Sequence, residues 1–210
     1  MATELRGPEL RGLYAITPDD NLTPRLSALV AAALDGGVRL VQYRNKLANP
    51  ALRRSQAGEL LRVCRGQGAR LIINDDLPLA VELGADGVHL GREDGDLAAA
   101  RAALGAGRLL GVSCYGDLDA AARACAAGAD YLAFGAVFAS ITKPQAPRIP
   151  LALLAAAKKR FGLPIAAIGG INLDNAAEAI AAGADLLAVV SDLFDAMDIA
   201  ARARAYENLF

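Results

Sequence analysis

The stretch GADYLAFG, residues 128–135, shows a pattern that recurs along the chain. Related stretches are DGGVRLVQYR at 35–44, GADGVHLG at 84–91 and GADLLAVVS at 183–191. In each, a glycine that suits the end of a helix precedes a short apolar run that suits a buried strand. The repeat indicates an α/β protein. We interpret Asp86, Asp130 and Asp185 as structural residues of the connecting loops.

Four further apolar runs alternate with these stretches: GLYAIT from 12, RLIIND from 70, LLGVSC from 109 and PIAAIGGI from 164. Ala- and Leu-rich segments of helical composition, such as residues 22–37, separate the runs. Eight strand–helix alternations favour a single (β/α)₈ TIM barrel over a doubly wound sheet. A chain of 210 residues leaves no room for a second domain. We expect residues 1–11 to form a flexible N-terminal extension.

Composition narrows the class of protein. The chain is 54% hydrophobic and 21% charged, which is typical of a soluble globular domain, and its net charge of −1 gives no basic field for nucleic acid. The widely spaced Cys64, Cys114 and Cys125 indicate neither a disulfide framework nor a zinc site and favour a cytoplasmic protein. The N-terminus lacks the apolar core of a secretion signal, and no run is long enough to span a bilayer.

Polar side chains cluster where the apolar runs stop. Gln42, Arg44 and Lys46 lie at alternate positions, so they project from one face of a strand. Asn74 and Asp75 end the next run. Ligands of parallel barrels bind at the C-terminal ends of the strands. An amide and two cations at one strand end predict an anionic ligand.

A second acidic residue, Asp94, follows the strand after that of Asp75. Carboxylates from adjacent strands can share a Mg²⁺ ion that keeps several waters and meets a substrate phosphate. Helix capping or turn formation explains either aspartate about equally well. If the charge of Mg²⁺ neutralises the charges of both carboxylates, the three cations Arg44, Lys46 and Lys143 would balance a diphosphate ester of roughly three negative charges.

A second anion site is predicted after the last two strands, at AIGGIN (167–172) and VVSD (189–192). Barrels often bind phosphate there through glycine N–H groups and a helix N-terminus, so Gly170 and Ser191 are candidates; a tight turn and a helix cap are the alternative. His89 suits a hydrogen-bonded core residue better than a base. Ser113 suits a hydroxyl donor to phosphate, because no His–Asp arrangement adjoins it in the sequence.

Taken in order, LYAIT, QYRNK, NDDLPLA, GVHLGRED, GVSC, DYLAFGAVF, TKP, AIGGI and VVS closely resemble the thiamine phosphate synthase family, from about Gly12 to Ser191. The resemblance implies a (β/α)₈ transferase of thiamine biosynthesis. Such an enzyme joins the diphosphate of hydroxymethylpyrimidine to a thiazole phosphate and releases pyrophosphate with Mg²⁺. It also implies two phosphorylated small-molecule substrates as partners, no nucleic acid and no membrane, and it leaves homo-oligomerisation open.

The resemblance further implies roles for individual residues. The residues implied to bind the pyrimidine diphosphate are Gln42, Tyr43, Arg44, Asn45, Lys46, Asn74, Ser113 and Lys143. Those implied to bind the thiazole phosphate are Ser140, Ile141, Thr142, Gly170, Val190 and Ser191. Asp75 and Asp94 would hold Mg²⁺, and the catalytic residues would be Lys143, Arg44 and Ser113. The implied mechanism is dissociative: pyrophosphate leaves, and the thiazole nitrogen captures the pyrimidine carbocation.

Four positions depart from the family pattern. Relatives often have Gln at Arg92, His at Tyr115, and Thr-Pro-Thr where this chain has Ser140, Ile141 and Thr142; Ser140 keeps a hydroxyl group. Thiazole tautomerase, an isomerase of the same fold, is implied to use a histidine where this chain has Tyr115, and a non-catalytic phosphate-binding barrel is a further alternative. The intact QYRNK, ND and TK segments favour the synthase over the tautomerase, which does not need the diphosphate and metal residues. Asp75, Asp94 and Lys143 argue against the passive binder, which would need no pair of metal ligands.

Overall fold

The computed structural model describes residues 10–139, 145 and 147–210. Over these residues the chain forms eight strands, at the positions that the apolar runs predict. They are β1 (Gly12–Ile16), β2 (Leu40–Tyr43), β3 (Arg70–Asn74), β4 (Gly87–Leu90), β5 (Leu109–Tyr115), β6 (Tyr131–Phe134), β7 (Ile165–Ile168) and β8 (Leu186–Val189).

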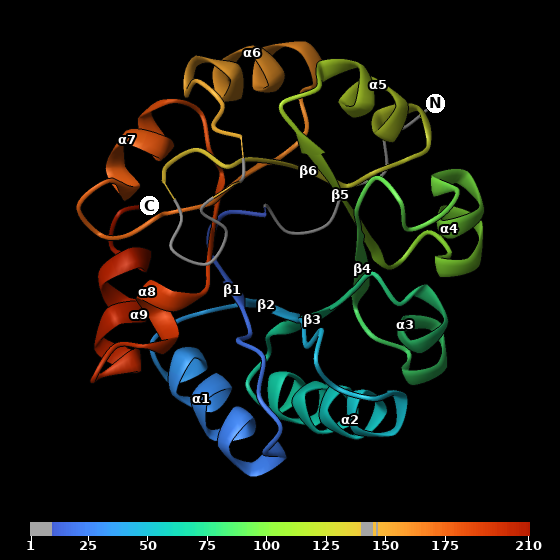
Figure 1. Cartoon of the computed structure of the whole chain (residues 1–210), viewed down its shortest axis with the longest axis vertical. Helices are drawn as coiled ribbons and strands as arrows, with labels where there is room; N and C mark the ends of the chain where they lie inside the picture. The colour runs from blue at the N-terminus through green and yellow to red at the C-terminus, as the bar shows by residue number, and fades with distance from the viewer. Residues whose placement is uncertain (1–9, 140–144, 146) are drawn as a thin grey trace.

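Helices follow the strands and form a ring around them (Figure 1). They are α1 (Thr23–Asp35), α2 (Pro50–Gly66), α3 (Leu77–Leu83), α4 (Leu97–Leu104), α5 (Leu118–Ala126), α6 (Ala152–Phe161), α7 (Ala176–Ala181), α8 (Ser191–Phe194) and α9 (Ile199–Glu207). Each strand pairs in parallel with the next, and β1 also pairs with β8. The sheet is therefore closed, and the predicted (β/α)₈ barrel is confirmed.

Two buried clusters hold the barrel together. The larger lies between strands and helices, where apolar side chains such as Leu13, Val41 and Leu187 meet the inner faces of the helices. The smaller fills the barrel interior and includes Tyr14 and Tyr131 beside small and aliphatic residues. Because strand side chains alternate, every strand except β4 contributes residues to both clusters, and the interior is packed rather than hollow.

The loops that leave the strands supply the starts of several helices. The Asn49 side chain accepts the Leu52 N–H at 2.9 Å at the start of α2, and the Asp76 carboxylate accepts the Leu79 N–H at 3.0 Å at the start of α3. Each cap satisfies a backbone donor that the helix itself cannot satisfy. At the other end of α3, Gly84 adopts φ 64°, the left-handed conformation predicted for glycines at helix ends.

Three aspartate carboxylates each link two neighbouring strands, at the end of the barrel opposite the polar strand ends. Each accepts a backbone N–H near the start of the preceding strand, at 2.7–2.8 Å; the pairs are Asp86 with Leu71, Asp130 with Leu110 and Asp185 with Ile165. Their predicted structural role is confirmed. For β1 the acceptor comes from α9 instead, where Glu207 Oε1 accepts a hydrogen bond from the Leu13 N–H at 3.1 Å.

The expected N-terminal extension, residues 1–11, lies outside the described residues except for Leu10 and Arg11. Arg11 donates to the carbonyl of Phe210 at 2.8 Å. Within the part of the chain that is described, no helix has the length and apolar character needed to cross a membrane.

Candidate functional site

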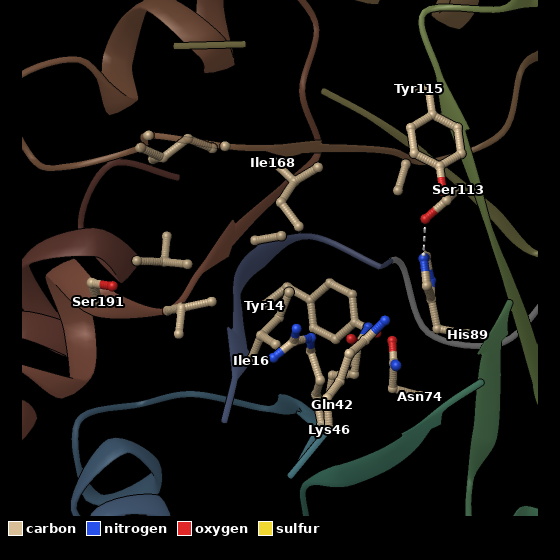
Figure 2. A pocket seen from close by; sticks show the side chains of 18 of the residues that line it. Tyr14, Ile16, Gln42, Lys46, Asn74, His89, Ser113, Tyr115, Ile168 and Ser191 are labelled. Carbon is tan, nitrogen blue, oxygen red and sulfur yellow. Dashed lines mark hydrogen bonds between the residues drawn. The ribbon is translucent and has the colours of Figure 1, made fainter. Parts of the chain in front are cut away.

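A cavity of about 810 Å³ opens at the C-terminal ends of the strands, where the polar strand ends meet (Figure 2). The predicted site residues that line it are Gln42, Arg44, Lys46, Asn74, Asp75, Asp94, Ser113, Gly170, Val190 and Ser191. Ser191 lies across the cavity from Ser113 in Figure 2. The structure therefore brings together most of the residues that the sequence singled out, from six of the eight strands or the loops that follow them.

The end of β2 is held in place from the loop after β1. One Asp19 carboxylate oxygen accepts the Lys46 N–H at 2.6 Å, and the other lies 3.3 Å from an Arg44 guanidinium nitrogen. Thr17 Oγ1 accepts the Arg44 N–H and donates to the Arg44 carbonyl, both at 2.9 Å. These contacts fix the backbone that carries the two cations, and Gln42, Arg44 and Lys46 all line the cavity as predicted.

Tyr43 and Asn45 lie on the other face of the same segment. The Tyr43 hydroxyl donates to Gln56 Oε1 at 2.9 Å, and the Asn45 amide donates to Gln56 Oε1 and to the Asp20 carbonyl. Both residues line a neighbouring cavity of about 400 Å³, which Lys46 also borders, rather than the large one. Their side chains stabilise the strand end, and a part in substrate binding stays a prediction.

The two adjacent acids after β3 have different surroundings. Asp76 caps α3, whereas Asp75 adopts φ 63° and borders the cavity, with its Oδ2 atom 3.5 Å from Lys46 Nζ. Burial, together with the nearby Asp94 carboxylate, raises the pKa of Asp75. Asp94 itself accepts the Gly91 N–H at 2.6 Å, which fixes its position. Two carboxylates are thus held beside each other at the cost of mutual repulsion.

This pair fits a divalent cation. A cation between Asp75 and Asp94 would remove the repulsion that raises the Asp75 pKa, and hard oxygen atoms are what Mg²⁺ prefers. Among the described residues no group of three or more His, Cys, Asp or Glu side chains could hold a metal. A metal here would therefore take its remaining ligands from water and from phosphate oxygens, as Mg²⁺ often does.

His89 and Ser113 form a hydrogen-bonded pair that the sequence did not reveal. His89 Nε2 lies 2.8 Å from Ser113 Oγ (Figure 2), and His89 Nδ1 lies 3.0 Å from the Tyr131 hydroxyl. His89 is therefore the hydrogen-bonded core residue predicted, although it also borders the cavity. Burial lowers the pKa of His89 to about 4, and a tyrosine replaces the carboxylate of a catalytic triad. The pair is unsuited to nucleophilic catalysis.

Tyr115 stands at the rim of the cavity, at an irregularity in the pairing of β5 with β6. It has φ 55°, its side chain is half-exposed, and the Arg92 guanidinium carbon lies 5.2 Å from the centre of its ring. Two of the positions that depart from the family pattern therefore contact each other. Tyr115 borders the cavity, as a proton-transfer residue at that position would, but it makes a cation–π contact instead.

The far side of the cavity is formed by the turns after β7 and β8. Gly170 adopts φ 64°, and a Cβ atom there would overlap the Ala139 carbonyl group. The glycine is thus required by packing, whatever it binds. Val190 and Ser191 border the same space, and α8 is a single turn of four residues. The adjacent Asp192 carboxylate is neutralised by Arg202, with N–O distances of 2.9 and 3.0 Å.

Four predicted residues lie outside the described residues. They are Ser140, Ile141, Thr142 and Lys143.

Sequence reasoning missed the contribution of the loop after β1. Thr17 and Asp19 directly follow a strand, so the rule that identified the other sites would have included them. It also missed Tyr14 and Tyr131, which read as core residues because they stand within apolar runs. Their hydroxyl groups meet only when the barrel closes, at a distance of 2.7 Å.

Comparisons with known proteins agree with this geometry. The family model described as thiamine monophosphate synthase matches residues 13–193. A thiamine-phosphate synthase of Aromatoleum aromaticum is 59% identical over 201 residues, covering 96% of this chain and 97% of the relative, and one from Methylobacillus flagellatus is 56% identical over 203 residues, covering 97% of each. The solved thiamine phosphate pyrophosphorylase of Pyrococcus furiosus superimposes with a TM-score of 0.85 at 32% identity, covering 96% of both chains. The chain belongs to the thiamine monophosphate synthase family, a family of transferases.

Proposed function

We propose that this chain joins 4-amino-2-methyl-5-hydroxymethylpyrimidine diphosphate to a thiazole phosphate, giving thiamine phosphate and pyrophosphate in the cytoplasm. The observation that carries the proposal is a single cavity whose one side holds Arg44, Lys46 and a carboxylate pair, and whose other side holds Gly170 and Ser191. Two separate phosphate-binding regions suit two phosphorylated substrates. The high identity to named thiamine-phosphate synthases supports the same reaction.

Asp75 and Asp94 are the proposed ligands of Mg²⁺. When bound, the ion would supply positive charge to the diphosphate and so favour its departure. Arg44 and Lys46 would bind the same group with a planar fork and a point charge, respectively. Asp19 would hold both cations at a fixed distance from the cavity, because it contacts Arg44 and the backbone of Lys46.

The proposed chemistry breaks the bond between the pyrimidine methylene carbon and the diphosphate oxygen. The electron pair leaves with pyrophosphate, and the thiazole nitrogen then donates its lone pair to the methylene carbon. The protein contributes electrostatic stabilisation of the departing group and alignment of the two rings. Arg44, Ser113 and Lys143 are the proposed donors to the departing oxygens, and Gly170, Val190 and Ser191 would bind the thiazole phosphate.

The test is incubation of the purified protein with both substrates and Mg²⁺, with thiamine phosphate and pyrophosphate measured together. We expect equimolar formation of both products, and its loss in Asp94→Asn. Conversion of one thiazole isomer into another without pyrophosphate release would instead indicate a tautomerase. Binding of either substrate without turnover would indicate a non-catalytic barrel, and either result would overturn the proposal.

A further inference from the structure

A chain of hydrogen bonds crosses the floor of the cavity from β2 to β5. Gln42 Nε2 donates to the Tyr14 hydroxyl at 2.7 Å, and that hydroxyl lies 2.7 Å from the Tyr131 hydroxyl. Tyr131 in turn contacts His89 Nδ1 at 3.0 Å, and His89 Nε2 contacts Ser113 Oγ at 2.8 Å. The chain therefore begins and ends on residues that border the cavity, and it passes through Tyr131, which does not.

The chemistry of the groups gives the chain a direction. An amide nitrogen only donates, and a hydroxyl has one proton to give. Because Gln42 donates to Tyr14, the Tyr14 proton has an acceptor within this set of hydrogen bonds only if Tyr14 donates to Tyr131 and Tyr131 donates to His89 Nδ1. A neutral imidazole that accepts at one nitrogen carries its proton on the other. His89 thus donates from Nε2 to Ser113 Oγ, and the Ser113 proton is left for the cavity.

Burial limits the partners available to these groups. Tyr131 is fully buried, Tyr14 is 1% exposed and Gln42 is 3% exposed. The absence of a side chain at Gly111 leaves room for the Tyr131 ring, because a Cβ atom on Gly111 would overlap it. Its ring is stacked on that of His89, with centroids 5.6 Å apart and planes 28° apart. The hydroxyl is therefore held where it can join the two halves of the chain.

We propose that Tyr131 is a positioning residue, which keeps His89 in the Nε2–H tautomer and thereby directs the Ser113 hydroxyl proton into the cavity. The proposal rests on the proposed function, in which Ser113 meets the anionic diphosphate. An anion needs donors. With the chain reversed, Ser113 would give its proton to His89 and present only lone pairs to the phosphate oxygens, which would repel them.

His89 is the only histidine in the chain, so its tautomer can be measured directly. In protein labelled with ¹⁵N-histidine, the two ring nitrogens and their protons are assigned by NMR at neutral pH. The wild-type protein should show a protonated Nε2 and an unprotonated Nδ1. A protonated Nδ1 would overturn the proposal. The spectrum is recorded without substrates, so it tests the direction of the hydrogen bonds independently of the reaction. Failure of the wild type to form thiamine phosphate would overturn the proposed function instead.

Tyr131→Phe removes the central hydroxyl and keeps the ring. We expect both tautomers of His89 to be populated, and kcat/KM for the pyrimidine diphosphate to fall roughly tenfold, the loss typical of weakening one hydrogen bond to a charged group. Should this variant not fold, Tyr14→Phe interrupts the same chain one link earlier and should give the same two effects. A histidine spectrum identical to that of the wild type in the folded variant would overturn the proposal.

Two further variants distinguish a positioning role of the Tyr131 hydroxyl from a general loss of packing in the protein. Tyr206→Phe removes another buried tyrosine hydroxyl, which donates to Asp192 at 2.6 Å, and should leave the His89 spectrum unchanged. In a Ser113→Ala background, Tyr131→Phe should lower kcat/KM by less than about twofold, because its effect is transmitted through the serine hydroxyl. Independent, multiplying losses in the double variant would overturn the proposal.

Discussion

Asp75→Asn should stabilise the metal-free protein and abolish its stabilisation by Mg²⁺. Burial and then the Asp94 carboxylate raise the pKa of Asp75 in the folded state. An acid with a raised folded-state pKa disfavours the fold once it ionises, so its cost is present at neutral pH and disappears as pH falls below its unfolded value. Asn carries no charge, and it also tolerates the positive φ of 63° at this position.

The expected gain is small because the site is partly open. The Asp75 side chain is 35% exposed, so solvent screening leaves a repulsion of roughly 0.5–1 kcal/mol. Its ion pair with Lys46, at 3.5 Å and more than half exposed on the lysine side, is worth about 0–0.5 kcal/mol. The net gain is about 0.5 kcal/mol, or roughly 1–2 °C in melting temperature for a chain of this size.

Binding of Mg²⁺ should reverse the order of the melting temperatures of the wild type and Asp75→Asn. At ten times its Kd, Mg²⁺ stabilises the wild type by about 1.4 kcal/mol, which corresponds to roughly 3–6 °C. The variant, with one ligand lost, should gain almost nothing. The assay is a pair of thermal melts for each protein, one in chelator and one in Mg²⁺. The wild type should melt below Asp75→Asn in chelator and above it in Mg²⁺.

The neighbouring residue supplies a matched control. Asp76→Asn makes the same chemical change one position along, at a helix cap where asparagine serves as well as aspartate. It should keep the full Mg²⁺ shift. A lower melting temperature for Asp75→Asn in chelator, or an undiminished Mg²⁺ shift in that variant, would refute the reasoning that places the two carboxylates in a repulsive metal-binding pair.

Three other substitutions test separate parts of the site. Gly170→Ala should destabilise the fold by roughly 1–3 kcal/mol in urea melts, because the new methyl group meets the Ala139 carbonyl at a positive φ; an unchanged midpoint would contradict that packing. Asp19→Ala should lower kcat/KM for the pyrimidine diphosphate roughly tenfold, or about 1.4 kcal/mol, because the Lys46 backbone loses its acceptor. Equal losses for both substrates would contradict a role of Asp19 at the diphosphate alone. Lys143→Ala should reduce kcat more than it raises KM in single-turnover measurements, because charge grows on the departing pyrophosphate; a change in KM alone would show a binding role.

The architecture was predictable because it depends on patterns that are local in the sequence. Apolar runs such as LLGVSC and PIAAIGGI, with helical segments between them, identify all eight strands, and their number then favours closure. The side-chain period of two correctly placed Gln42, Arg44 and Lys46 on one face. It also placed Tyr43 and Asn45 on the other, although the family resemblance implied that they bind substrate.

Distant contacts were beyond the reach of the same reasoning. No histidine adjoins Ser113 in the sequence, yet His89 lies 2.8 Å away because β4 and β5 are neighbours in the sheet. Nothing local in the sequence distinguishes Tyr131 from any other core tyrosine, since its partners come from β1 and β4. Asp75 and Asp76 likewise look equivalent in sequence, and only the backbone turn assigns one to the cavity and the other to a helix.

The dependence of β1 on Glu207 has a consequence during synthesis. β1 is synthesised before the other strands, but its second neighbour, β8, and the carboxylate that accepts the Leu13 N–H come later in the sequence than β2 to β7. Until then the nascent sheet has an unpaired edge, which is where strands of other chains can add. Pairing of β1 with β8 therefore removes the last unpaired edges of the sheet, and truncations that remove β8 together with α9 should accumulate as aggregates rather than as open barrels.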